Sequence, residues 1–258
     1  MTDFFNVIML AAVQGVAEFL PISSSGHLVL GRSLLGLGDA GLRLDVFLHV
    51  GTLVAVFAFY RAMVARLVRG LFATERSARR AAWTFAGKLA LSSVPVGVVG
   101  LLFNDEIAEA TPRMVGVGLL VTGTLLCATR FLPRGDRDVS WGRALVMGLA
   151  QALAIVPGIS RSGTTLAAAR AVRVEAEKSA EFSFLMSAPP IVGAALLEIL
   201  QAGETAAAPD VAWGLCAAGA ALAAVVGYFA LKLLVATLKS RAFWLFGPYC
   251  LIVGALAL

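Results

Sequence analysis

Charged residues and paired cysteines are scarce in this chain of 258 residues. Only 14% of the residues are Asp, Glu, Lys or Arg, whereas 59% are hydrophobic and the mean hydropathy is +0.87. This balance argues against a soluble domain and predicts an integral membrane protein. The three cysteines lie in apolar runs without CxxC spacing, which argues against disulfides and metal motifs. The N-terminus lacks a basic stretch before its first apolar run, so no cleavable signal peptide is expected.

The net charge of +5 comes from an uneven distribution of basic residues. Sixteen of the 21 Lys and Arg residues lie in four gaps between apolar runs: 61–80, 130–143, 170–178 and 232–241. Cytoplasmic loops carry such an excess in membrane proteins, so these gaps are expected in the cytoplasm and both termini outside. The same clustering favours a membrane topology over nucleic-acid binding, and we expect no nucleic-acid partner.

Six apolar stretches are near the length of about 20 residues that a helix needs to cross a bilayer. They are residues 44–66, 82–103, 112–132, 178–200, 211–238 and 242–258. Prolines inside them (Pro95, Pro189, Pro190 and Pro248) are expected to kink or break helices near a functional site, although ordinary membrane helices also contain proline. The predicted fold class is an all-α integral membrane protein with about six transmembrane helices.

Two further segments, 4–36 and 140–172, each contain a polar break between two short apolar runs. The breaks are copies: QGVAEFLPISSSG from Gln14 and QALAIVPGISRSG from Gln151 share six of thirteen residues at an offset of 137. Each apolar run is too short to cross the bilayer, so re-entrant helix–loop–helix hairpins are predicted. Interfacial or simple spanning helices remain the alternative.

The duplication and the topology together predict an inverted repeat. Three expected spans separate the two hairpins, and an odd number of crossings turns the second copy upside down. A single membrane domain over residues 1–258 would then contain repeat 1 at about 1–133 and repeat 2 at about 138–258. Polar backbone at membrane depth survives only beside protein or a water-filled cavity, so the two breaks are expected to form one site.

The first break carries a carboxylate and a run of hydroxyls. Gln14 and Glu18 are four residues apart and share a helix face. A carboxylate inside a membrane is costly and indicates function. The run Ser23-Ser24-Ser25-Gly26-His27 follows, and hydroxyls with backbone N–H groups at a helix start can bind an anion. A plain cluster of helix-capping serines is the alternative.

The second break carries Arg161 at the position equivalent to Ser24. A guanidinium binds phosphate through two parallel hydrogen bonds and stays charged at membrane depth. Ser160, Ser162, Thr164 and Thr165 surround it with donors. A snorkelling anchor is the alternative for this arginine. Because one copy supplies Glu, Ser and His and the other supplies Arg, the pair predicts one phosphate held from both sides.

These motifs resemble the undecaprenyl-diphosphate phosphatase family, also called bacitracin resistance proteins (UppP/BacA type). The (E/Q)xxxE motif stands at 14–18 and the PGxSRSxxT motif at 157–165. The stretches FLPISSSGH, DVFLHVGTL and VPVGVVGLLFNDEI also match, so the resemblance covers essentially the whole chain. Many members have Glu where this chain has Gln14, which puts a metal site with two carboxylates in doubt.

The resemblance implies hydrolysis of undecaprenyl diphosphate to the monophosphate, a step in recycling the lipid carrier for peptidoglycan synthesis. The enzyme would lie in the bacterial inner membrane, with its site open to the periplasm. The implied roles are Glu18 as a metal or acid–base carboxylate, Ser24 as nucleophile, His27 as base or phosphate ligand, and Arg161 as diphosphate clamp. Expected substrate-binding residues are Gln14, Ser23, Ser25, Gly26, Ser160, Ser162, Gly163 and Thr165. The implied cofactor is Mg²⁺ or Ca²⁺, held by Glu18 and Gln14.

Several points stay open at the level of sequence. Either Ser24 attacks phosphorus, or His27 and Glu18 activate a water molecule. His49 is a pore-facing or a packing residue, and Asp45 and Lys88 are equally ambiguous. A polyprenyl-phosphate transporter or flippase is the main alternative function, because inverted repeats with broken helices are frequent in transporters. A structural subunit is a second alternative, and a homodimer is left open.

Overall fold

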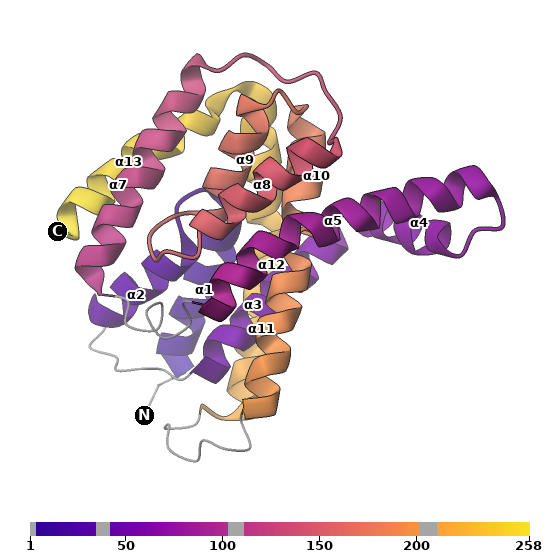
Figure 1. The fold of residues 1–258 in the computed structure, drawn as a ribbon. Helices are drawn as coiled ribbons and strands as arrows, with labels where there is room; N and C mark the ends of the chain where they lie inside the picture. The colour runs from indigo at the N-terminus through magenta and orange to yellow at the C-terminus, as the bar shows by residue number, and fades with distance from the viewer. Residues whose placement is uncertain (1–3, 35–41, 103–110, 202–210) are drawn as a thin grey trace.

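The computed structural model describes residues 4–34, 42–102, 111–201 and 211–258, and these are almost entirely helical (Figure 1). The helices are α1 Phe4–Phe19, α2 Ser24–Leu34, α3 Leu42–Phe59, α4 Arg61–Leu71, α5 Arg76–Leu102, α7 Pro112–Ala128, η1 Thr129–Phe131, α8 Trp141–Leu153, α9 Arg161–Ala171, α10 Ala176–Leu185, α11 Ala188–Gln201, α12 Trp213–Ser240, η2 Ala242–Leu245 and α13 Phe246–Leu256. Outside them, an isolated backbone bridge joins Arg137 and Val174. The all-α class is confirmed.

Within the described ranges, three helices are long and apolar enough to cross a membrane. They are α5, the continuous α7–η1 unit over Pro112–Phe131, and α12. A bent pair formed by α3 and α4 raises the number to four if it is counted as one span. This is fewer than the six spans expected, because two of the expected stretches are divided between helices and a third, 242–258, forms an apolar helix that is too short.

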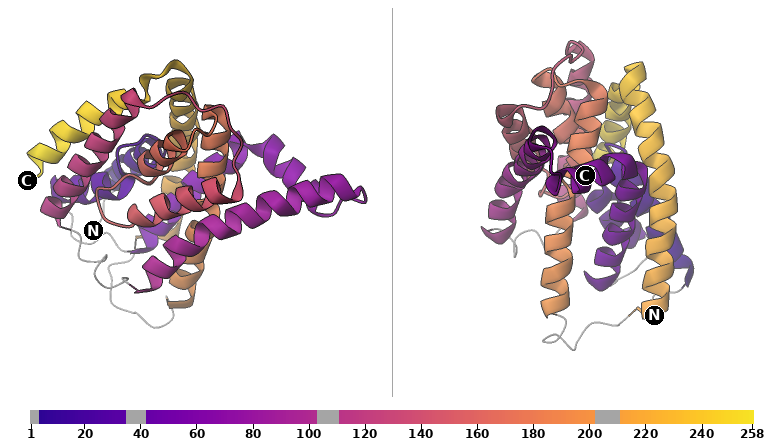
Figure 2. Two further views of the ribbon diagram at one scale, coloured as in Figure 1. Left: turned by 45° about the horizontal axis from the view of Figure 1, so that its top comes forward. Right: turned by 90° about the vertical axis from the view of Figure 1, so that its right-hand side faces the viewer.

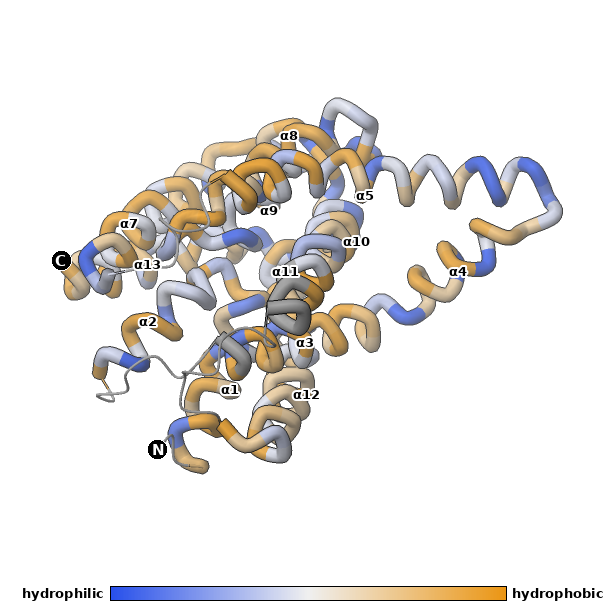
Figure 3. The backbone as a smooth tube through the Cα atoms, turned by 60° about the horizontal axis from the view of Figure 1, so that its bottom comes forward, coloured by the Kyte–Doolittle hydropathy of each residue, from blue (hydrophilic) through white to orange (hydrophobic). Residues whose placement is uncertain are grey.

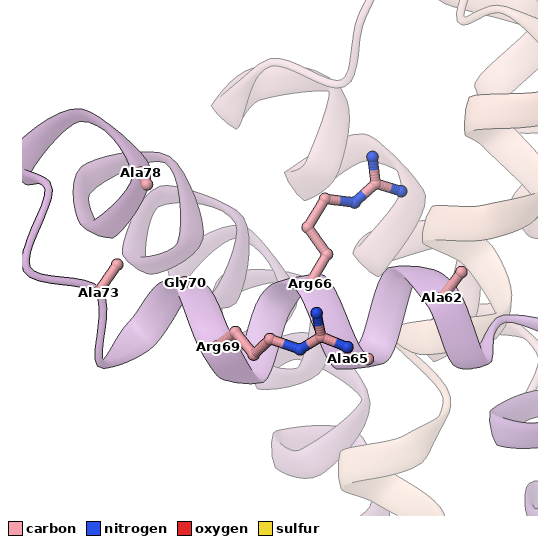
Figure 4. A pocket seen from close by; sticks show the side chains of 7 residues that line it. All are labelled: Ala62, Ala65, Arg66, Arg69, Gly70, Ala73 and Ala78. Atoms are coloured by element: carbon pink, nitrogen blue, oxygen red, sulfur yellow. The ribbon is translucent and has the colours of Figure 1, made fainter.

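The stretch 44–66 is divided at Tyr60. That residue leaves helical geometry (φ −94°, ψ 22°), and α4 continues at 81° to α3. The expected basic loop 61–80 is therefore mostly helix: α4 and the start of α5 form an arm that projects from the bundle (Figures 1 and 2). Figure 4 shows Arg66 and Arg69 with small residues around a cavity of about 680 Å³ in this arm.

The other divided stretch and the short one lie in the second half of the chain. Residues 178–200 are interrupted between α10 and α11, and α11 starts with Ala188 followed by two prolines. Proline lacks a backbone N–H and is tolerated in the first helical turn, so a new helix begins there. In residues 242–258, η2 continues into α13, and together they form the short apolar helix Ala242–Leu256. In contrast, Pro95 lies inside α5, which continues to Leu102, so this proline does not break its helix.

Small residues let the central helices approach closely. A Cβ atom built on Gly51 of α3 would lie 2.2 Å from the carbonyl oxygen of Ala220 in α12. Such contacts between small residues are typical of helix packing in membranes. As a result α12 packs along both α1 and α3. These contacts position α1, which carries Gln14 and Glu18.

Large apolar side chains cover much of the outer surface. Phe229 on α12, Ile252 on α13 and Leu149 on α8 are 64%, 62% and 53% exposed. Figure 3 shows that hydrophobic residues run along the helices of the bundle, whereas hydrophilic residues gather at the tip of the arm. Exposed apolar surface on this scale is typical of contact with lipid. The chain is thus a membrane protein with several apolar helices.

Candidate active site

The two polar breaks, α1–α2 and α8–α9, lie against each other. A Cβ atom built on Gly26 would lie 3.2 Å from Cα of Gly158. The hydroxyl of Ser162 donates a hydrogen bond of 3.2 Å to the carbonyl oxygen of Leu20. The structure therefore brings together segments that are 137 residues apart in the chain.

The duplicated residues make the same local contacts in both breaks. Ser23 Oγ accepts a hydrogen bond from the Gly26 amide at 3.3 Å, and Ser160 Oγ accepts one from the Gly163 amide at 3.1 Å. A second serine two residues on, Ser25 or Ser162, approaches each capping hydroxyl. Such caps satisfy backbone N–H groups at a helix start, so α2 and α9 both begin at the breaks.

Glu18 is the centre of the site. Its carboxylate is buried and forms an ion pair with the Arg161 guanidinium through Oε1. Oε2 accepts hydrogen bonds from Ser24 Oγ at 2.7 Å and from Gln14 Nε2 at 3.1 Å. Four of the residues predicted from sequence thus meet at one carboxylate: Gln14, Glu18 and Ser24 from the first half and Arg161 from the second.

Arg161 is the first residue of α9, and its surroundings fix its position. The Phe184 ring centroid lies 5.6 Å from the guanidinium carbon, which adds a cation–π contact. Thr165 Oγ1 donates to the Arg161 carbonyl at 2.7 Å and also lies 2.6 Å from Ser183 Oγ. The Arg161 Nη1 atom is buried and has no hydrogen-bond partner among the described residues. This nitrogen can donate to a ligand without breaking a contact inside the protein.

Helix α7 supports the second break from behind. Thr122 Oγ1 donates to the Gly158 carbonyl and accepts from the Ser160 amide, both at 3.0 Å. Gly158 has a φ of +87°, a conformation that favours glycine. A Cβ atom on Gly118 would lie 2.3 Å from the Pro157 carbonyl oxygen, so α7 can approach the break only with glycine there.

The two histidines of the chain have different surroundings. His27 Nδ1 donates to the Ser23 carbonyl and Nε2 lies 2.8 Å from the Tyr249 hydroxyl, so both ring nitrogens are engaged away from Ser24. His49 Nδ1 donates to the Asp45 carbonyl at 2.8 Å, and its Nε2 lies 3.8 Å from Glu18 Oε2. Its Nε2 atom therefore faces the Glu18 carboxylate.

His49 is the site residue that sequence analysis left unassigned. Its signal was a polar ring inside an apolar stretch, four residues after Asp45. Asp45 itself pairs with Arg32 of α2 and thereby ties α2 to α3. Lys88 donates to the Val139 carbonyl at 2.6 Å, which is a contact between the α5 helix and a loop.

Most of the predicted substrate-binding hydroxyls are used inside the protein. Ser23, Ser160, Ser162 and Thr165 are almost fully buried and form the caps and contacts given above, whereas Ser25 is exposed. Gly26 and Gly163 supply the amides that these caps receive. The structure places all of them around the breaks, and their roles toward a substrate stay predictions.

The described residues contain no group of three or more His, Cys, Asp or Glu side chains suited to a metal ion. Near Glu18, the Gln14 Oε1 atom is buried without a hydrogen-bond partner among the described residues. One carboxylate and one amide oxygen are therefore the ligands at hand. This set fits a hard cation only if the substrate supplies further oxygens.

Comparison with known proteins identifies the family. The model of the family described as bacitracin resistance protein BacA matches residues 7–256. An undecaprenyl-diphosphatase from Desulfatibacillum aliphaticivorans is 40% identical over 273 residues, covering 99% of this chain and 98% of the relative. The undecaprenyl-diphosphatase of Desulfosudis oleivorans is 42% identical, with 97% and 96% covered. That of Methanosphaera stadtmanae is 37% identical, with 100% and 98% covered. The chain belongs to the BacA family.

Proposed function

We propose that this chain is an undecaprenyl-diphosphatase, which hydrolyses undecaprenyl diphosphate to undecaprenyl phosphate and inorganic phosphate. The observation that carries the proposal is the convergence on Glu18 of the Ser24 hydroxyl and the Arg161 guanidinium from opposite halves of the chain. Full-length relatives that are named for this activity support the same assignment.

The arrangement suits phosphoryl transfer, which depends on positioning and on neutralising negative charge. Ser24 is the first residue of α2 and Arg161 is the first residue of α9. Helix N-termini carry partial positive charge and free N–H groups, so two of them meet where a diphosphate would bind. In this proposal the terminal phosphate replaces Glu18 as the ion-pair partner of the Arg161 guanidinium. The unpartnered Nη1 atom then also donates to the phosphate.

Ser24 is the proposed nucleophile. Its oxygen would attack the terminal phosphorus while its proton passes to Glu18, which already accepts that hydrogen bond at 2.7 Å. The bond from phosphorus to the bridging oxygen breaks and releases undecaprenyl phosphate. Water then attacks the phosphoserine phosphorus, the bond from phosphorus to Ser24 Oγ breaks, Ser24 takes its proton back from Glu18, and inorganic phosphate leaves. His49, whose Nε2 lies 3.8 Å from Glu18 Oε2, is the proposed acceptor of the proton of that water. Direct attack by an activated water is the alternative.

A divalent cation, Mg²⁺ or Ca²⁺, is part of the proposal. Mg²⁺ is usually held by one or two carboxylates together with substrate phosphate oxygens. Glu18 and the free Gln14 Oε1 atom are the residues that would hold it once substrate has drawn Arg161 away. When bound, the cation would neutralise charge on the phosphate oxygens.

The proposed topology is an inverted repeat with two re-entrant hairpins, α1–α2 and α8–α9. The matching caps at Ser23 and Ser160 support a structural repeat, and the basic gaps support the orientation. With those gaps in the cytoplasm, the first hairpin enters from outside and the site opens to the periplasm of the inner membrane. The prenyl chain would lie along the exposed apolar helices.

The test is phosphate release from undecaprenyl diphosphate by purified protein in detergent, with and without a chelator. Detergent removes compartments, so hydrolysis there separates an enzyme from the flippase alternative. Glu18→Ala and Arg161→Ala should each lower the rate by orders of magnitude while the protein stays folded. Unchanged rates in either variant would refute the role given to that residue.

A further inference from the structure

A second cluster of positive charge surrounds a cavity where α9 and α12 end. This cavity measures about 140 Å³, and four cationic side chains line it: Arg134, Arg170, Lys239 and Arg241. They come from the loop after η1, from the end of α9 and from the end of α12. The positive-inside rule explains why basic residues lie on this side of the membrane, but it does not require them to surround a single cavity.

The backbone fixes the loop that carries Arg134. The Asp136 and Arg137 amides both donate to the Arg173 carbonyl, and the Glu175 amide donates to the Arg137 carbonyl. A Cβ atom on Gly135 would lie 1.9 Å from the Val174 carbonyl oxygen, so glycine allows the loop to lie flat on the turn between α9 and α10. Arg134 is thereby held beside the end of α9.

Two arginines at the cavity have constrained positions. Arg241 ends α12 in the left-handed conformation, with φ 66°, which is uncommon for a residue with a side chain. Arg170 Nη2 donates to the Leu132 carbonyl, but its Nε atom is buried without a hydrogen-bond partner among the described residues. A cation at the end of α9 is favoured by the helix dipole. The same effect favours Lys239 in the last turn of α12 and Arg241 at its end, but it does not account for Arg134, which lies in a loop, or for the meeting of all four cations at one cavity.

The nearby acids are already paired, and one of them pairs with a cation of the cavity, Lys239. Glu177 pairs with Lys239, and Glu175, which lines the cavity, pairs with Lys178 at 2.8 Å. Lys178 also bonds Asp138 at 2.5 Å, and this hydrogen bond lowers the pKa of the exposed Asp138 carboxyl. Within the described ranges, neither Arg134 nor Arg241 has an ion-pair partner. The cluster thus has an excess of positive charge.

We propose that this cavity is a second anion site, which binds a phosphate group on the cytoplasmic side of the protein. The volume would hold about four or five water molecules at roughly 30 Å³ each, which is room for one phosphate group. Arginine guanidinium groups and a lysine ammonium are the usual donors to such a group. The site lies roughly 14 Å along α9 from Arg161, because Arg170 is nine positions further along the helix. It is therefore separate from the active site, and it does not depend on hydrolysis.

The phosphate group has two sources, inorganic phosphate or the headgroup of an anionic lipid, and two arms distinguish them. The first arm is calorimetric titration of inorganic phosphate into detergent-solubilised Arg161→Gln protein, in which the active site cannot compete. The second arm measures phosphatidic acid retained by the same protein in nanodiscs, by native mass spectrometry. Both arms are repeated after adding Arg134→Gln and Arg241→Gln, which remove two exposed side chains. The matched control is Arg137→Gln, an exposed arginine of the same loop that does not line the cavity.

We expect binding in at least one arm, weakened at least about tenfold by the paired cavity substitutions, since a hydrogen bond to a charged group contributes that much. The Arg137→Gln control should bind as the parent does. Phosphate binding in the first arm identifies the free ion, and binding confined to the second identifies the lipid headgroup. Absence of binding in both arms would overturn the proposal, and so would equal binding by cavity and control variants.

Discussion

Glu18→Gln tests the electrostatic core of the site, because it removes one charge and little volume. Arg161 would keep a neighbouring amide but lose its counter-ion, and its side chain is only 17% exposed. Leaving a buried charge unpaired costs about 3–5 kcal/mol. We expect the lower part of that range, because the Phe184 ring still faces the guanidinium. Turnover should fall by about 10²–10⁴, the usual contribution of a positioned base, because Ser24 loses its proton acceptor.

A double-mutant cycle separates the ion pair from other effects of the substitution. Thermal unfolding and phosphate release are measured for Glu18→Gln, Arg161→Gln and the double variant. Removing both partners leaves no unpaired charge, so the double variant should be clearly less destabilised than the sum of the single variants. Glu75→Gln, at an exposed acid of the arm, is the control and should change neither quantity. Additive destabilisation, within about 0.5 kcal/mol, would contradict direct contact between Glu18 and Arg161.

Three further predictions follow from single contacts. Ser24→Ala should abolish phosphate release while substrate binding persists. The control Ser25→Ala, at an exposed neighbour, should keep most of the rate. Substantial turnover by Ser24→Ala would exclude Ser24 as the nucleophile. His49→Gln should lower kcat about 100-fold with little change in KM, and an unchanged kcat in a full kinetic series would exclude it as a base. Gly118→Val should lower the free energy of unfolding by about 3 kcal/mol or more, because its Cβ atom would lie 2.3 Å from a backbone oxygen. The control Gly142→Val lies in open space and should cost about 1 kcal/mol or less in the same denaturation experiment.

The site could be predicted from sequence to a large extent. The spacing of Gln14 and Glu18 predicts their contact, because residues four apart share a helix face, and the hydrogen bond confirms it. No local rule connects Arg161 with Glu18, which lie 143 residues apart. Only the duplication of the two breaks indicated that they meet. The placement of His49 beside Glu18 depends on how α3 packs on α1, and sequence alone does not fix that packing.

The division of the membrane helices was harder to predict. Arg61 follows Tyr60 directly and marks a fall in hydropathy there, but a fall in hydropathy does not predict the 81° turn between α3 and α4. Likewise, one apolar run covers α10 and α11, and only the two prolines hint at the interruption. These breaks, together with the short helix at 242–256, explain why fewer long spans occur than the apolar stretches suggested.

The most direct test of the account is a disulfide between the two breaks. A Cβ atom built on Gly163 lies 3.5 Å from Cβ of Pro21, within the range that a disulfide spans. The substitutions Pro21→Cys and Gly163→Cys are made after the native cysteines are changed to alanine, because Cys250 Sγ lies 3.5 Å from the Pro21 carbonyl oxygen. We predict that this pair is oxidised to an intramolecular disulfide in membranes, whereas Pro21→Cys with Gly142→Cys stays reduced. Free thiols in the first pair under the same oxidant would mean that the two halves do not meet, and would contradict a shared site.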